Sequence, residues 1–86
     1  MVILQWVAVH PLEVNENYLV IVKNTDTGQE SRYITRSNSY RLPGSLQPGI
    51  AQSARFEWQV MVVMGTNVNA APISGQATTW VFIWGP

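Results

Sequence analysis

The sequence lacks cysteine and has few charged residues, and both shortages limit what the protein can do. Cysteine is absent from all 86 residues, which excludes a disulfide framework, a thiolate metal site and a cysteine nucleophile. Charged residues make up 12% of the chain, about half the usual share. Five basic residues balance five acidic ones, and the basic ones are scattered. We therefore expect no nucleic-acid partner, because phosphate binding requires clustered positive charge.

Long apolar runs are also missing. No stretch approaches the roughly 18 apolar residues that a membrane-spanning helix needs, so we predict no membrane insertion. The first residues carry no basic segment ahead of their apolar positions, and we expect no signal peptide in this chain. Gly85 and Pro86 are typical of the start of a linker.

Catalytic and metal-binding patterns are absent as well. His10 is the only histidine, and we interpret it as a loop residue, since metal sites need several converging ligands. The acidic residues Glu13, Glu16 and Asp26 lack the spacing of a calcium loop. Glu57 alternates with aromatic neighbours and should point to solvent, and no Gly-x-Ser-x-Gly motif occurs. We predict a protein that is not an enzyme and that needs no cofactor and no metal.

The chain is instead rich in apolar and aromatic residues that alternate. Hydrophobic residues make up 47% of it, including four Trp, three Tyr and two Phe. Alternation with a period of two predicts β-strands, and polar clusters with Gly, Asn or Pro separate them. The predicted strands are residues 2–9, 17–24, 30–35, 40–42, 54–64 and 77–84. We expect no helix apart from a short turn within 44–53, and a loop at 65–76 in which Ile73 tucks in.

Four groups of residues resemble the fibronectin type III family in its divergent bacterial form. They are Leu4 and Trp6, then Tyr18, Val20 and Val22, then Leu42, Leu46, Pro48 and Gly49, and finally Phe56, Trp58, Val60 and Val62. The resemblance implies an all-β, immunoglobulin-like antiparallel sandwich of six or seven strands. It also implies that residues 1–86 are a single domain of a larger bacterial protein, extracellular or at the cell surface.

The sequence departs from this family at its first strand. Nothing before residue 2 can supply that strand, so it is missing, or the sandwich is open at one edge, or another chain supplies the strand. Residues 2–9 carry no protective charge, so we predict self-association through an open edge. Phe56 stands where the family has a tyrosine, and no Arg-Gly-Asp is present, so integrin-type recognition is not implied.

The resemblance makes three strands neighbours in one sheet, namely 17–24, 54–64 and 77–84. Residues on their outward faces would then form one apolar patch, our candidate interaction surface: Leu19, Ile21, Met61, Val63, Val81 and Ile83. We assign Trp6, Trp58 and Trp80 to the core. Trp84 is left between the core and an interdomain contact, and it joins the candidate interaction residues.

The leading functional prediction is a non-catalytic spacer or protein–protein interaction module. Its partners would be neighbouring domains, another protein, or a second copy bound at the open edge. The alternative is a carbohydrate-binding module that uses exposed tryptophans. Coplanar exposed aromatics beside polar groups would favour sugar, whereas a flat aliphatic patch would favour protein.

Overall fold

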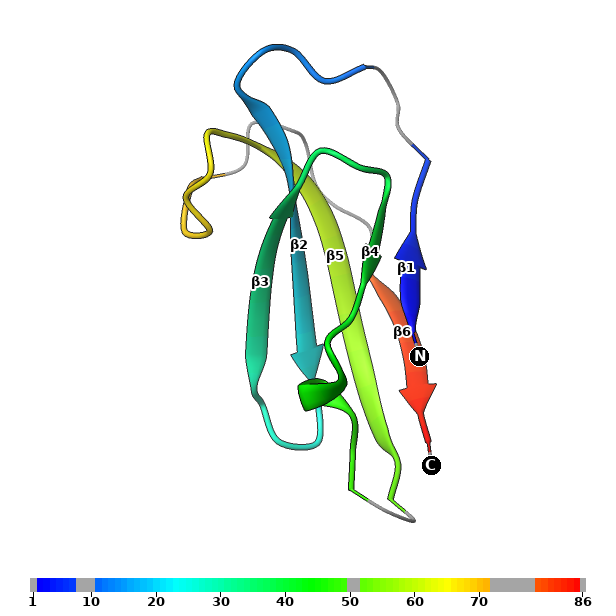
Figure 1. Ribbon diagram of the computed structural model, residues 1–86. Helices are drawn as coiled ribbons and strands as arrows, with labels where there is room; N and C mark the ends of the chain where they lie inside the picture. The colour runs from blue at the N-terminus through cyan, green and yellow to red at the C-terminus, as the bar shows by residue number, and fades with distance from the viewer. Residues whose placement is uncertain (1, 8–10, 50–51, 72–78, 86) are drawn as a thin grey trace.

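The computed structural model describes residues 2–7, 11–49, 52–71 and 79–85, which form two facing antiparallel sheets (Figure 1). The strands are β1 (Ile3–Gln5), β2 (Glu16–Asn24), β3 (Glu30–Thr35), β4 (Ser39–Arg41), β5 (Ala54–Met64) and β6 (Trp80–Trp84). One sheet has the order β1-β4 and the other the order β3-β2-β5-β6. The prediction of an all-β sandwich is confirmed. A 3-10 helix, η1 (Gly44–Leu46), lies inside the predicted turn segment. No helix among the described residues is long and apolar enough to span a membrane.

The central position of β2 explains why its sequence is apolar on both faces. It pairs with β3 on one side and with β5 on the other. Tyr18, Val20 and Val22 face the small sheet and belong to the core, while Leu19 on the opposite face is also fully buried. A strand covered on both sides gains little from polar residues on either face. The predicted adjacency of β2, β5 and β6 is confirmed by the same pairings.

The turn between β2 and β3 follows from its Asn, Asp and Gly residues. The side-chain oxygen of Asn24 accepts hydrogen bonds from the backbone N–H groups of Asp26 and Thr27 at 2.9 and 3.2 Å. Gly28 has a φ of 79°, which residues with a Cβ rarely adopt. This turn fixes the register in which Val22 faces Ser31.

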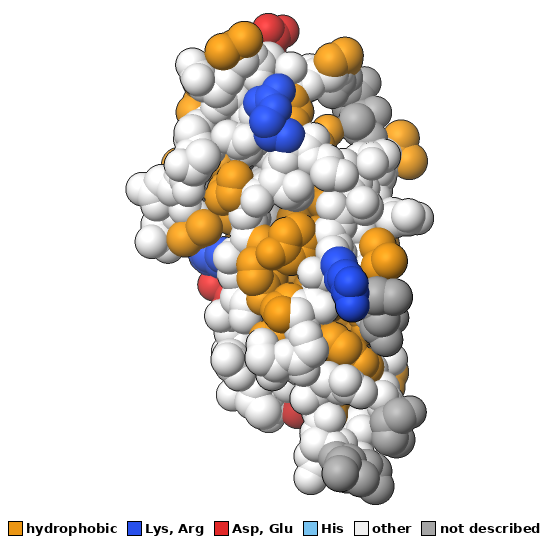
Figure 2. Space-filling view, viewed as in Figure 1, with side chains coloured by type: hydrophobic (Ala, Val, Ile, Leu, Met, Phe, Trp, Pro, Cys, Tyr) orange, Lys and Arg blue, Asp and Glu red, His pale blue; other side chains and the backbone are white. Residues whose placement is uncertain are grey.

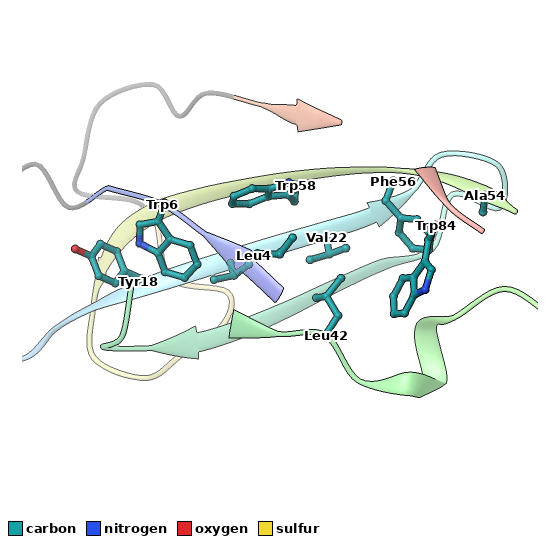
Figure 3. Close-up of a cluster of buried hydrophobic side chains, with 10 residues drawn as sticks. Leu4, Trp6, Tyr18, Val22, Leu42, Ala54, Phe56, Trp58 and Trp84 are labelled. Carbon is teal, nitrogen blue, oxygen red and sulfur yellow. The ribbon is translucent and has the colours of Figure 1, made fainter. Parts of the chain in front are cut away.

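The core lies between the inner faces of the two sheets (Figure 3). Its buried members are Leu4, Trp6, Tyr18, Val20, Val22, Leu42, Ala54, Phe56, Trp58 and Trp84. Aromatic pairs cross between neighbouring strands of the large sheet: Phe56 stacks on Phe82 at 5.3 Å, and Trp58 on Trp80 at 4.4 Å. Such cross-strand pairs stabilise a sheet beyond their burial alone.

The small sheet is held against the large one by side chains from both of its strands. Tyr40 on β4 stacks on Tyr33 of β3 with ring centroids 4.7 Å apart. Burial, and after it the neighbouring Tyr33, raises the pKa of Tyr40. Trp6 follows β1 and continues its pairing, since the Trp6 N–H donates to the Asn38 carbonyl at 3.0 Å. Strand β1 is nevertheless shorter than the predicted 2–9, whose last two residues lie outside the described part.

Candidate interaction site

The six aliphatic residues predicted to form an outward patch do share one face of the large sheet. The register places Leu19 opposite Met61 and Asn17 opposite Val63, while Val81 stands opposite Glu57. Side chains alternate between the two faces of a strand, and the core residues occupy the other set of positions. Alternation therefore predicted the face correctly.

Two of these residues are not at the surface, which corrects the predicted patch. Leu19 and Val63 are completely buried, although both point away from the core between the sheets. Ile21 and Met61 are half-buried, and only Val81 and Ile83 are well exposed. The well-exposed part of the predicted patch is therefore confined to β6.

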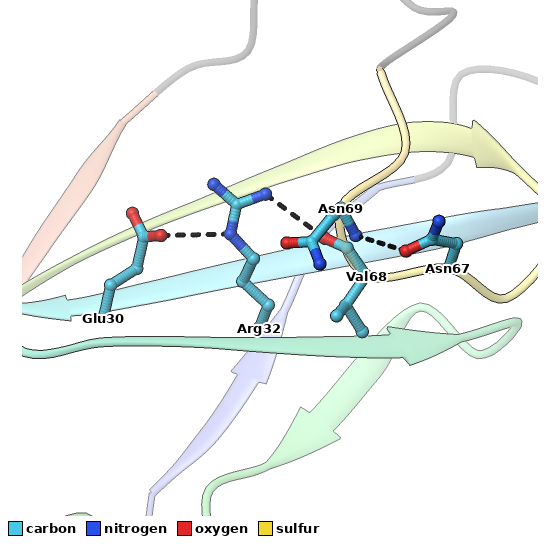
Figure 4. Close-up of polar contacts among 5 residues, drawn as sticks. All are labelled: Glu30, Arg32, Asn67, Val68 and Asn69. Atoms are coloured by element: carbon cyan, nitrogen blue, oxygen red, sulfur yellow. Dashed lines mark hydrogen bonds and ion pairs between the residues drawn. The ribbon is translucent and has the colours of Figure 1, made fainter.

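The chain that follows β5 accounts for this burial. The Asn17 side-chain amide donates to the Gly65 carbonyl at 2.6 Å, where the segment 65–71 leaves the strand. The Arg32 guanidinium donates to the Val68 carbonyl at 3.2 Å, on the outer face of β3 (Figure 4). The segment 65–71 is thus held near Asn17 on β2 and near Arg32 on β3. Leu19 lies between these two points, because it is the next residue after Asn17 on this face of β2 and β2 pairs with β3. The segment therefore crosses Leu19. The outer face thus carries a small second core.

Arg32 is expected to contribute through this hydrogen bond more than through its ion pair. It also contacts Glu30 at 3.0 Å, but both side chains are partly exposed, and such pairs contribute little. We predict that Arg32→Ala lowers the free energy of unfolding by about 1.5–3 kcal/mol, the usual range for a hydrogen bond that involves a charged group. Urea denaturation measures this change. The control is Glu30→Gln, which should stay within about 0.5 kcal/mol of the wild type; equal losses in the two variants would contradict the assignment.

Two tryptophan positions differ from the prediction. Trp84 is buried against Phe56, with ring centroids 5.7 Å apart, and it shares a hollow with Leu42 of the opposite layer. It is therefore a core residue and offers no interdomain surface. Trp80, assigned to the core, is 40% exposed. Its face is correct, since it stacks on Trp58, but at the start of β6 its ring stays partly uncovered, whereas Trp84 at the end of the same strand is covered.

The exposed large aliphatic and aromatic residues gather on two strands. Five of the seven on the described surface lie on β6, on β1 or just after β1: Ile3 (51% exposed), Val7 (90%), Trp80 (40%), Val81 (49%) and Ile83 (64%). We call these five residues the β1–β6 edge. Figure 1 shows both strands on the same side of the molecule. Trp6 and Trp80 both contact Trp58, which connects the two strands.

The β1–β6 edge also has free backbone groups. β4 is the only strand that pairs with β1, and β5 the only one that pairs with β6, among the described residues. Strands β1 and β4 are antiparallel, with Leu4 opposite Tyr40. The Trp6 N–H donates to the Asn38 carbonyl, and the Leu42 N–H donates to the Val2 carbonyl. The even-numbered residues of this segment therefore form its hydrogen bonds to the chain of β4. The odd-numbered residues 3, 5 and 7 therefore direct their N–H and C=O groups away from β4.

Comparison with known proteins gives no relative. No protein-family model matches the chain, and neither the curated proteins nor the solved structures contain a match. The site is therefore characterised by its geometry alone.

The other candidate positions do not converge on a site. No three His, Asp or Glu side chains lie together in the described residues. The Glu16 carboxylate accepts the Glu13 N–H at 2.7 Å, whereas the Asp26 carboxylate accepts the Arg55 N–H at 3.3 Å. His10 and Ile73 lie outside the described residues.

A hollow of about 310 Å³ lies between the β2–β3 turn and the segment after η1. Its lining includes the amides of Gln29, Gln47 and Gln52 and one aromatic ring, Phe56. Phe56 is buried and offers no face for stacking. The hollow therefore lacks the exposed aromatic platform that the carbohydrate alternative requires.

Proposed function

We propose that this chain is a non-catalytic protein-binding module, a fibronectin type III-like domain of a larger extracellular or cell-surface bacterial protein. The observation that carries the proposal is the β1–β6 edge. It combines five exposed apolar side chains with two strands that have a free side. Exposed edges are usually protected by charge, and residues 2–7 and 79–85 contain no charged residue.

The strand arrangement supports the fibronectin type III-like part of the proposal. The resemblance requires the strands that carry Tyr18, Trp58 and Trp80 to be consecutive in one sheet, and they are β2, β5 and β6. It also requires the strand with Leu4 and Trp6 to cover them from the other layer, where β1 lies (Figure 3).

Protein is favoured over sugar as the ligand because only one tryptophan is exposed. Trp6, Trp58 and Trp84 are buried. Trp80 alone offers part of its ring, and the other exposed large residues of β6, Val81 and Ile83, are aliphatic and lie on the opposite face of the strand. Stacking on a sugar ring usually uses aromatic faces beside hydrogen-bonding groups, whereas aliphatic side chains suit a protein partner.

Selection of random peptides displayed on phage against the immobilised chain tests this function. We expect enrichment of uncharged peptides with alternating apolar residues, since these can add a strand to a free edge. Lysine at an anchor, as in Ile3→Lys or Val81→Lys, should weaken their binding by about tenfold or more.

The matched control is Val14→Lys, because Val14 is also exposed but lies outside the β1–β6 edge. It should bind the selected peptides as the wild type does. Failure to enrich any peptide, or equal binding by all three lysine variants, would overturn the proposal. A glycan array that gives signal lost in Trp80→Ala would replace it with the carbohydrate alternative.

A further inference from the structure

The β1–β6 edge presents one strand whose free side is complementary to itself. Ile3 and Gln5 of β1, and Val7 two residues beyond its end in the same phase, direct both their N–H and C=O groups outward. Two such strands placed antiparallel can exchange these groups in pairs. The occupant of a strand edge must be extended and must offer the same repeat of donors and acceptors.

We propose that the occupant is a second copy of this chain, with the two β1 strands paired antiparallel about a two-fold axis through Gln5. This inference rests on the proposed function and names its partner. Residue 3 of one copy then stands opposite residue 7 of the other, and Gln5 stands opposite Gln5. All positions from 3 to 7 are used, and the three facing pairs exchange about six backbone hydrogen bonds.

The side chains favour this register. Ile3 and Val7 are both exposed on the outer face of the small sheet. In the pair, Ile3 of each copy stands beside Val7 of the other copy, so this contact forms twice. Apolar and β-branched cross-strand pairs stabilise antiparallel strands. The two exposed Gln5 side chains meet at the axis, where one amide can donate to the other. A two-fold axis through Leu4 would pair Ile3 with Gln5 and lose both contacts between Ile3 and Val7.

The charges permit the pairing. Across a two-fold axis each charge near the axis meets an identical charge, and like charges directly opposite are unfavourable. Residues 2–7 carry none. The nearest charge in register is Arg41, opposite Ile3 on β4. Its symmetry mate lies three strand spacings across and four residues along the strands, about 20 Å away, where salt at physiological strength screens most of the repulsion. In the view of Figure 2 the basic groups lie apart from one another.

Cross-linking through introduced cysteines tests the pairing and its register. The chain has no cysteine of its own, so single variants give unambiguous products. Under mild oxidation, Gln5→Cys should form a disulfide dimer about tenfold faster or more than Val14→Cys, because pairing raises the effective concentration of the thiols. Ile3→Cys alone should form disulfide dimers slowly, because residue 3 of one copy does not face residue 3 of the other. A mixture of Ile3→Cys with Val7→Cys should form them quickly, because residue 3 of one copy faces residue 7 of the other.

Gln5→Lys provides an independent variant that adds no thiol. Two lysines at the axis should abolish self-association in sedimentation experiments at millimolar concentration, while Val14→Lys should leave it unchanged. Circular dichroism checks that each variant is folded. Equal oxidation rates for Gln5→Cys and Val14→Cys, or faster reaction of Ile3→Cys alone than of the mixture, would overturn the pairing. If phage peptides still bind the edge, only the second copy is wrong as occupant; if none bind, the proposed function fails with it.

Discussion

Trp6→Ala is expected to lower the free energy of unfolding by about 3–5 kcal/mol, the range for removing a large aromatic side chain from a core. A domain of this size has only about 5–10 kcal/mol in total, so the variant should be largely unfolded at physiological temperature. Denaturation in urea, followed by circular dichroism, measures the change.

The size of this effect comes from the place of Trp6 between the layers. Its ring meets Tyr18 edge to face at 5.4 Å and lies 6.3 Å from Trp58. It contacts both central strands of the large sheet, and it is nearly fully buried, as its alternation with Leu4 predicted. Alanine leaves a cavity that a sheet of only two strands can close only partly.

Trp6→Phe is the matched control. The indole Nε1 of Trp6 is buried without a hydrogen-bond partner among the described residues, and an unsatisfied buried donor is costly. Phenylalanine keeps an aromatic ring and removes this donor, so it should retain most of the stability that alanine loses. If alanine and phenylalanine destabilise equally, ring packing at Trp6 is not the source of the effect. A urea midpoint that barely moves in Trp6→Ala would contradict the core position itself.

Leu19→Ala is expected to lower the free energy of unfolding by about 2–5 kcal/mol, although Leu19 points away from the space between the sheets. It is completely buried beneath the segment 65–71, and its neighbours in register are Ile34 and Met61. Removing its side chain therefore leaves a cavity as a core substitution does. The same urea denaturation provides the measurement.

Val81→Ala is the control on the same face of the same sheet. Val81 is about half exposed, and surface substitutions away from packed features usually stay within about 0.5 kcal/mol of the wild type. A small loss in Leu19→Ala, similar to that in Val81→Ala, would mean that the segment 65–71 does not cover the outer face in solution.

The sequence by itself determined the strands and their faces. Alternation identified all six strands, and the bounds of 30–35 and 54–64 agree with β3 and β5. The two-sided apolar pattern of 17–24 placed β2 inside a sheet, which its two pairing partners confirm. These features are local, because a period of two and a turn such as Asn24–Gly28 are fixed by neighbouring residues.

Only the tertiary structure decided which of those faces are covered. Leu19 and Val81 are indistinguishable by pattern, yet the first is buried and the second is exposed. The cover over Leu19 comes from residues 65–71, and their polar composition is typical of an ordinary loop. Its position depends on the bonds from Asn17 and Arg32, which are distant in sequence.

The same reason explains why Trp80, assigned to the core, is partly exposed and why Trp84, left undecided, is buried. Both alternate in phase on β6 and both face the small sheet, so their sequence context is alike. Trp84 is buried because Leu42 and its neighbours reach it, whereas Trp80, at the other end of β6, remains 40% exposed. Alternation specifies the direction of a side chain, but burial depends on what the rest of the chain places above it.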